Sequence, residues 1–227
     1  MRKVLVVVAH PDDEILGMGG TIAKYVAQGD EIGLLIITDG STSQYKESPI
    51  LSQIIEDKRH ETLTAANILG ISKVYYGGLP DMQLDMVAHT DINKSIENVV
   101  QEFNPDILYT HFEGDVNKDH QCVYQSVLVA CRPVPGQKIR EVYSFSVPSS
   151  TEWNMQNPNN TFFPNVFVDI EGEYAKKKYK AMEAYVTELR DYPHPRSIDT
   201  LIILDKAVGL QVGLKCAESF ICHRVIR

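Results

Sequence analysis

The sequence contains no C-x-x-C pair and only four cysteines among its 227 residues, at positions 122, 131, 216 and 222. The missing pair argues against a zinc knuckle or a redox dithiol, and single scattered cysteines are typical of buried thiols in an intracellular protein. Basic residues are also scarce, because 22 Lys and Arg stand against 30 Asp and Glu. The resulting net charge of −8 argues against nucleic acid as the main partner, since Lys and Arg carry phosphate binding.

Long apolar runs, internal repeats and low-complexity tracts are absent as well. No segment reaches the roughly 18 apolar residues of a membrane span. The apolar run from Val4 to Ala9 follows two basic residues as in a signal peptide, but it is short and ends at His10 without a cleavage site of small residues. We therefore expect a soluble, cytoplasmic protein with one domain over residues 1–227, a length sufficient for a sizeable core.

Apolar runs alternate with amphipathic segments along the first half of the chain. Continuous apolar runs predict strands buried on both faces, and spacings of three and four predict helices. Strands are expected at 4–8, 32–37, 73–76 and 106–110, and helices at about 15–29, 51–69, 92–103 and 118–131. This alternation predicts an α/β fold, with a mostly parallel, doubly wound sheet and helices on both faces.

The remaining segments are less regular. A polar stretch from Ser41 to Pro49 is typical of a loop. Strands are expected at 141–147 and 165–170, a helix with an apolar face from Ala175 to Leu189 ends before Pro193, and a closing strand is expected near the C-terminus.

The glycines at positions 17, 19 and 20 invite comparison with a phosphate-binding loop. They lack the G-x-G-x-x-G spacing and follow two carboxylates that would repel a pyrophosphate. Close packing of the first helix explains them better, so a nicotinamide-dependent oxidoreductase is disfavoured.

Polar residues gather where the first strand ends, in the run His10-Pro11-Asp12-Asp13-Glu14. The carboxyl ends of strands in an open α/β sheet are where ligands bind. Imidazole and carboxylate are ordinary zinc ligands, whereas an aspartate before a helix is also a common N-cap. Both interpretations stay open for Asp12 and Asp13, and one carboxylate can cap while the other coordinates.

A second polar group follows the strand that ends at Thr110. It contains His111, Asp115, Asn117, Asp119 and His120, at the start of another predicted helix. Taken alone, these residues are explained by capping. If the two strands are neighbours, however, His120 reaches a metal held by His10 and Asp13, and Asp119 can orient a histidine. Three protein ligands leave one position free, as in catalytic zinc sites.

These motifs resemble the LmbE-like N-deacetylases, also called the PIG-L family. The resemblance rests on Ala9-His10-Pro11-Asp12-Asp13-Glu14 with Gly17 to Gly20, and on Asp115-x-Asn117-x-Asp119-His120, with weaker matches at Arg59-x-Glu61, Leu79-Pro80-Asp81, Tyr192 to Ser197 and Ala217 to Phe220. It implies a Rossmann-like fold and zinc-dependent removal of acetyl from an N-acetylglucosamine-type amino sugar. It maps the metal ligands onto His10, Asp13 and His120 and the general base onto Asp12, and it implies a homo-oligomer.

One departure concerns the residue that stabilises the oxyanion. Many members of the family have a histidine three residues before the last metal ligand, where this chain has Asn117. His111, His194, Arg59 or Asn117 are therefore the candidates for this role. Substrate contacts are expected from Arg59, Asp81, His111, His194 and Arg196, although Arg59 can equally lie on a solvated helix face and Asp81 in a plain turn.

Other functions fit parts of the same pattern. The resemblance also covers a hydratase that adds water across a double bond of a dicarboxylate, which needs at least two cationic groups to hold its substrate. A purely structural zinc (Zn²⁺) site needs a fourth protein ligand, for which His223 is the only unusual candidate. Mixed nitrogen and oxygen ligands also suit iron (Fe²⁺).

Overall fold

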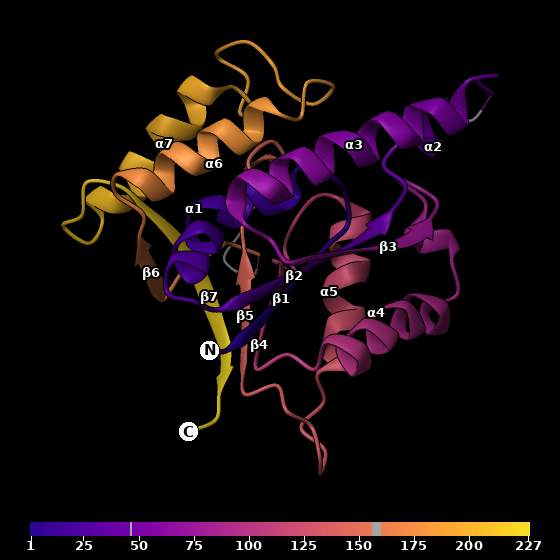
Figure 1. The fold of residues 1–227 in the computed structure, drawn as a ribbon, viewed down its shortest axis with the longest axis horizontal. Coiled ribbons are helices and arrows are strands. Elements are labelled where there is room, and N and C mark those ends of the chain that lie inside the picture. The colour runs from indigo at the N-terminus through magenta and orange to yellow at the C-terminus, as the bar shows by residue number, and fades with distance from the viewer. Residues whose placement is uncertain (46, 156–159) are drawn as a thin grey trace.

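The computed structural model describes residues 1–45, 47–155 and 160–227. A seven-stranded sheet lies at its centre, in the order β3-β2-β1-β4-β5-β7-β6 (Figure 1). The strands are β1 (Lys3–Val8), β2 (Glu31–Thr38), β3 (Lys73–Leu79), β4 (Ile107–His111), β5 (Glu141–Phe145), β6 (Val166–Asp169) and β7 (Ala217–Val225). The helices are α1 (Asp13–Ala27), α2 (Thr42–Tyr45), α3 (Leu51–Leu69), α4 (His89–Phe103), α5 (Lys118–Ala130), α6 (Glu173–Glu183) and α7 (Ile198–Leu210), with 3-10 turns at Leu84–Met86 and Thr151–Trp153.

The order of the strands places β1 at a topological switch point. The chain runs outward from β1 through β2 to β3, and then returns to β4 on the other side of β1. Strands β1 to β5 pair in parallel, and β7 runs antiparallel to both of its neighbours, β5 and β6. The predicted mostly parallel α/β sheet is thus confirmed, and the segments that follow β1 and β4 lie beside one another where ligands bind in such folds.

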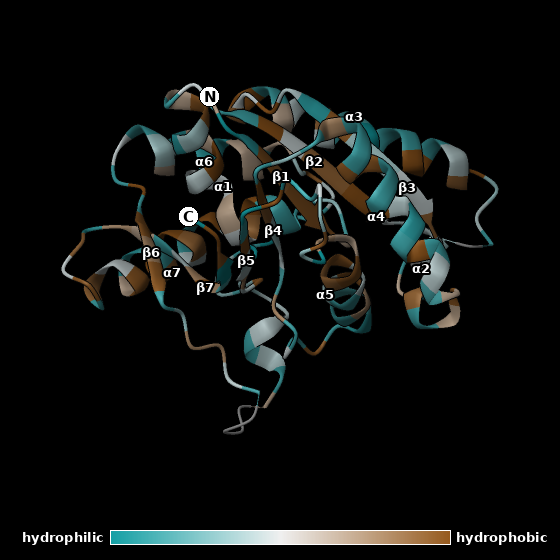
Figure 2. Cartoon of the chain, turned by 90° about the horizontal axis from the view of Figure 1, so that it is seen from below, coloured by the Kyte–Doolittle hydropathy of each residue, from teal (hydrophilic) through white to brown (hydrophobic). Residues whose placement is uncertain are grey.

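Alternate residues of β1 enter two separate hydrophobic cores. Val4, Val6 and Val8 pack with α1, α3, α6 and α7, whereas Leu5 and Val7 pack with α4 and α5 on the opposite face. All five side chains are fully buried, which is why every residue of β1 after Lys3 is apolar. Figure 2 shows the same distribution, with hydrophobic colour on β1 and β2 and hydrophilic colour on much of α3 and α4.

Glycines let α1 lie close to the elements around it, as predicted. A methyl group on Gly17 would stand 2.2 Å from a ring carbon of Phe145 in β5. One on Gly20 would stand 2.8 Å from Ile170. These positions therefore serve helix packing, which sets the direction in which α1 leaves the end of β1.

Helix α1 is bent at Met18, and the turn after the bend contacts Glu218 of β7, near the C-terminus. Met18 has non-helical backbone angles (φ −155°, ψ 23°), and Glu218 of β7 accepts hydrogen bonds from two amides of the next turn at 3.0 and 2.7 Å. The Glu218 carboxylate thereby satisfies amides that have lost helical partners. Lys178 of α6 lies 2.9 Å from Glu218 and 2.7 Å from Asp205 of α7, and all three side chains are buried. One charged cluster thus holds α1, α6, α7 and β7 together.

Several predicted boundaries are wrong. The expected loop 41–49 contains the short helix α2, and residue 46 of that stretch lies outside the described residues. Strand β3 continues to Leu79, and α6 ends at Glu183 although the apolar spacing continues to Leu189. Helix α7 was not predicted, because its apolar residues surround the helix and give no one-sided stripe.

No helix in the described part of the chain is both long and apolar enough to cross a membrane. All four cysteines are free thiols, and Cys131 and Cys216 are buried. Cys122 and Cys222 are only partly buried, so the prediction of buried thiols holds for two of the four cysteines.

Candidate metal centre and active site

Three donor atoms from the two predicted polar segments converge at the ends of β1 and β4. His10 Nδ1 lies 3.2 Å from His120 Nε2, and Asp13 Oδ2 lies 3.4 Å from each of these nitrogens. A tetrahedral ion with bonds of roughly 2.0–2.2 Å separates its ligand atoms by about 3.3–3.6 Å. The three donors thus already have nearly the spacing that a zinc ion requires.

Two further carboxylates fix the orientation of the histidines. Asp119 Oδ2 lies 3.1 Å from His10 Nε2, and Asp115 Oδ2 lies 3.1 Å from His120 Nδ1. Each contact engages the ring nitrogen that faces away from Asp13. Carboxylates commonly orient metal-binding histidines in this way. The chemistry of the donor set therefore fits a bound divalent cation.

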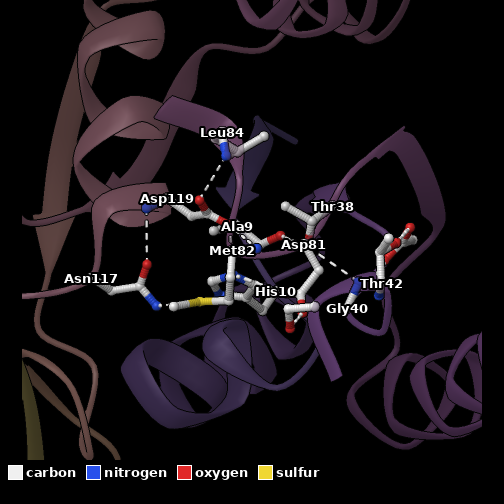
Figure 3. Close-up of polar contacts among 12 residues, drawn as sticks. Ala9, His10, Thr38, Gly40, Thr42, Asp81, Met82, Leu84, Asn117 and Asp119 are labelled. Atoms are coloured by element: carbon white, nitrogen blue, oxygen red, sulfur yellow. Dashed lines mark hydrogen bonds and ion pairs between the residues drawn. The ribbon is translucent and has the colours of Figure 1, made fainter. Parts of the chain in front are cut away.

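Asp119 also holds the loop after β3 against the site (Figure 3). Its two oxygens accept hydrogen bonds from the backbone amides of Met82, at 2.7 Å, and Leu84, at 3.0 Å. Asp81 in this loop lies 3.4 Å from His10 Nε2. His10, Asp81 and Asp119 thus form a second group with metal-ligand chemistry, but the Asp119 oxygens are already engaged by amides and by His10.

The surrounding carboxylates make the site attractive to positive charge. Burial lowers the pKa of His10, but hydrogen bonds to Asp119 and Asp13 raise it to about 10. Burial likewise lowers the pKa of His120, but the charge of Asp13 and the hydrogen bond to Asp115 raise it to about 9. A cation that binds here competes with these protons, so metal binding is expected to weaken as the pH falls.

Asp12 occupies the N-cap position of α1 without capping it. Its side chain makes no hydrogen bond to the helix, and its φ of 98° is unusual for a residue other than glycine. Strained backbone of this kind costs about 1–3 kcal/mol and concentrates at functional sites. The Asp12 side chain is buried, and its Oδ2 lies 3.4 Å from an Arg196 nitrogen but accepts no hydrogen bond from the described residues. Capping therefore does not explain this carboxylate.

The pKa values of the neighbouring carboxylates Asp12 and Asp13 are shifted in opposite directions. Burial raises the pKa of Asp12 well above its usual range, with a smaller opposing effect from Arg196. Burial also raises the pKa of Asp13, but the charges of His120 and His111 lower it well below its usual range. Such a split is the pattern that separates a permanently ionised group from one that exchanges protons.

A small cavity of about 120 Å³ opens onto the three donors. Seven of the eleven predicted site residues line it: His10, Asp12, Asp13, Asp81, Asn117, His120 and Arg196.

A family model described as "PIG-L: GlcNAc-PI de-N-acetylase" matches residues 5–131, more than half of the chain. The protein belongs to the PIG-L family. The predicted membership is thereby confirmed. The matched segment contains His10, Asp13 and His120, whose three donor atoms form the donor triangle.

Similar proteins carry different names. A Bacillus anthracis protein named as an N-acetyl-alpha-D-glucosaminyl L-malate deacetylase is 26% identical over 191 residues, covering 82% of this chain and 81% of its own. The 4-oxalmesaconate hydratase of Pseudomonas putida is 27% identical over 241 residues, covering 97% and 86%. The N,N'-diacetylchitobiose deacetylase structure from Pyrococcus horikoshii has a TM-score of 0.76 at 21% identity, covering 98% of this chain and 84% of that one, which supports the fold.

Four predicted residues of this PIG-L protein lie outside the cavity lining: Asp119, which orients His10, and Arg59, His111 and His194. Arg59 is on the exposed side of α3, with its guanidinium 5.1 Å from the centre of the Tyr76 ring, so the solvated-face interpretation describes it better. His111 is fully buried behind His120, with ring centres 3.9 Å apart. His194 is partly buried in the loop before α7, where its Nδ1 accepts a hydrogen bond from the Arg196 amide at 3.1 Å.

His111 has a clear alternative role in this PIG-L protein. Its Nε2 accepts a hydrogen bond from the backbone amide of Ala9 at 2.8 Å, which joins the ends of β4 and β1. Burial, together with the charge of His120, lowers the pKa of His111 to about 3, so the ring stays neutral. His111 therefore packs behind His120 and does not line the cavity.

Asn117 is both a helix cap and a cavity residue. Its Oδ1 accepts a hydrogen bond from the Asp119 amide at 2.9 Å, so the predicted capping interpretation is confirmed. Its Nδ2 donates to Met82 Sδ at 3.4 Å (Figure 3). Sulfur is a weak acceptor, so this NH₂ group remains available to a better one.

Sequence reasoning missed Lys58 and Glu188, which form an ion pair at the cavity wall. Lys58 directly precedes Arg59, yet it lies on the buried face of α3. The buried positions of this helix are 58, 62, 65, 66 and 69, and this helical spacing was the available signal. No local pattern marks Glu188, because its partner lies 130 positions earlier.

A serine-rich loop after β5 was also missed. The hydroxyls of Ser150 and Thr151 both donate to the carboxylate of Asp115, the group that orients His120. Ser149 adopts a φ of 75° and accepts a hydrogen bond from Arg196 Nε at 2.9 Å. This loop therefore contacts both the metal-centre side and the Arg196 side of the cavity.

Proposed function

We propose that this PIG-L protein is a zinc-dependent hydrolase that removes the N-acetyl group from an N-acetylglucosamine-type amino sugar or its conjugate. One observation carries the proposal: the donor triangle of His10, Asp13 and His120 opens onto a cavity in which a buried, uncapped Asp12 carboxylate stands beside it. Three protein ligands with an open side are the arrangement of catalytic metal sites.

The proposed roles of the residues follow from this arrangement. A bound zinc ion supplies Lewis-acid polarisation of the acetamide carbonyl and lowers the pKa of water. Asp12 accepts the proton of the attacking water and later delivers a proton to the leaving amine, for which a raised pKa is suited. Asp13 stays ionised as a ligand, and Asp119 and Asp115 hold the histidines in place.

Asn117 is the proposed donor to the developing oxyanion. Of the four candidates from the sequence, it is the one whose side chain lines the cavity. Its amide plane is held by the bond to Asp119, so the NH₂ group is oriented before substrate arrives. Asp81 and Arg196 at the cavity wall are proposed to contact substrate hydroxyls. His194 supports Arg196, because its ring accepts a hydrogen bond from the Arg196 backbone amide.

The proposal is tested by metal analysis of the purified protein, followed by acetate release from N,N'-diacetylchitobiose and related N-acetyl sugars with and without a chelator. We expect one divalent ion per chain, loss of acetate release on chelation and recovery with added Zn²⁺ or Fe²⁺. His120→Ala should lose both metal and activity. Acetate release that continues unchanged in metal-free protein would disprove the proposal.

The hydratase remains the second candidate, because the cavity does contain two cationic groups, Lys58 and Arg196. A dicarboxylate substrate needs such a pair. Both cations, however, already contact Glu188. Spectrophotometric loss of a conjugated dicarboxylate without acetate release from any sugar would favour this candidate.

A cytoplasmic location and a homo-oligomeric state remain predictions from the sequence and its resemblance. Light scattering during size-exclusion chromatography measures the oligomeric state directly. A monomer at micromolar concentration would contradict the prediction.

A further inference from the structure

Beside the donor triangle, the cavity is lined by two positive and two negative side chains. Glu188 contacts Lys58 Nζ, and its other oxygen lies 2.6 Å from an Arg196 guanidinium nitrogen. The same nitrogen lies 3.4 Å from Asp12 Oδ2. All four residues line the cavity, so each cation there already has a carboxylate partner.

We propose that Glu188 makes this active site selective for uncharged amino-sugar conjugates and disfavours those with a carboxylate or phosphate. This inference rests on the proposed deacetylase function and deepens it. An anionic group that entered the cavity would approach Glu188, Asp12 and Asp81, and Lys58 Nζ and Arg196 Nη1 are already paired with Glu188. Like charges brought together in a poorly solvated site repel strongly.

The ion pairs are positioned so that a substrate cannot easily exchange them. The Lys58 and Glu188 side chains are only 9% and 14% exposed. Displacing Glu188 would leave a buried ammonium without its carboxylate, which is costly. Arg196 is held from a second side by Ser149, so it cannot turn toward a new anion without breaking that bond.

Charge is also the property on which the similar proteins divide. The Bacillus anthracis relative is named for a malate conjugate and the Pseudomonas putida relative for a hydratase of an unsaturated acid, both of them anionic compounds. The Pyrococcus horikoshii structure is named for diacetylchitobiose, which is uncharged. The inference from the Glu188 contacts is that this chain acts on substrates of the uncharged kind.

A matched pair of substrates tests the inference: N-acetylglucosaminyl L-malate and its dimethyl ester, which has the same skeleton without the charges. We expect the wild-type protein to release acetate from the ester with a kcat/KM roughly tenfold or more above that for the dianion. If neither compound is hydrolysed, their inhibition constants against diacetylchitobiose hydrolysis give the same ratio. Equal values, or a preference for the dianion, would overturn the inference and leave the deacetylase proposal intact.

Glu188→Gln removes the negative charge and keeps the shape of the side chain. The ratio of kcat/KM for the ester to kcat/KM for the dianion should fall by roughly tenfold or more, mainly because KM for the dianion decreases. Glu183→Gln, at the exposed end of α6, is the matched control with the same change of net charge and should leave the ratio unchanged. An unaltered ratio in Glu188→Gln would refute the role of this residue. If that variant does not fold, Lys58→Gln serves instead and should widen the ratio.

If no acetyl sugar, neutral or charged, releases acetate, both proposals fail together. Because diacetylchitobiose is assayed in parallel, failure of the deacetylase function is distinguished from failure of the charge selection.

Discussion

Replacing Asp12 by asparagine separates metal binding from proton transfer. Asparagine has nearly the same shape and tolerates a positive φ as well as aspartate does, so the backbone at φ 98° should persist. The Asp12 carboxylate is outside the donor triangle, and metal content should therefore stay at the wild-type level. The contact with Arg196 at 3.4 Å is weakened, but the variant also escapes the cost of burying a carboxylate. We expect the free energy of unfolding to change by no more than about 1 kcal/mol.

The effect on turnover should be much larger. A general base contributes about 10²–10⁴-fold to a reaction of this type, so kcat should fall by that factor with little change in KM. The fall corresponds to about 3–5 kcal/mol of activation free energy. Acetate release and metal content are measured on the same preparation, with Asp13→Asn as a comparison that should lose metal. A kcat for Asp12→Asn within about tenfold of wild type would refute the assignment of the base.

Three further changes test the scaffold around the site. Burial raises the pKa of Glu14 to about 7 from 4.5, so this group contributes stability at acid pH that is lost as the pH rises through 7. In metal-free protein, the free energy of unfolding in urea should rise for Glu14→Gln relative to wild type, by up to about 3 kcal/mol between pH 4 and pH 8. A difference between the two proteins that stays constant with pH would contradict the raised pKa. Gly17→Ala forces a methyl group to 2.2 Å from Phe145 and should cost about 1–3 kcal/mol in thermal unfolding, whereas an unchanged Tm would show that α1 can move aside. Lys178→Met leaves two buried carboxylates without their counter-charge and should lower the free energy of unfolding by about 3–5 kcal/mol. The control Lys177→Met, at an exposed neighbouring position, should be nearly neutral. Equal effects of the two substitutions would rule out the buried cluster.

Those parts of the fold that local patterns determine could be predicted. The alternation of buried apolar runs and helix patterns over the first half of the chain predicted a mostly parallel sheet. The structure shows that β1 and β4 are parallel neighbours, a condition that the sequence left open. That topology is what places His120 beside His10 and Asp13. The helix α7 could not be predicted in the same way, because a one-sided apolar stripe was the signal sought and this helix lacks one.

The side chains of the cavity wall were harder to predict, because they are selected by tertiary contacts. Arg59 was predicted to contact substrate, whereas its neighbour Lys58 was not. One residue along a helix rotates a side chain by about 100°. Adjacent positions on a helix therefore face different surroundings, and here only Lys58 faces the cavity. The pairing of Lys58 with Glu188 depends on how α3 meets the loop after α6, which no local pattern encodes.

The bend of α1 has a consequence for shorter fragments of this chain. Residues 5–131 contain the whole donor triangle, yet the helix that begins at Asp13 is held by Glu218, and Arg196 beside Asp12 also lies beyond that segment. We therefore propose that residues 1–227 fold as one cooperative unit. A fragment that stopped at residue 131 would keep His10, Asp13 and His120 but lose Glu218 and Arg196, which contact α1 and Asp12 in the whole chain.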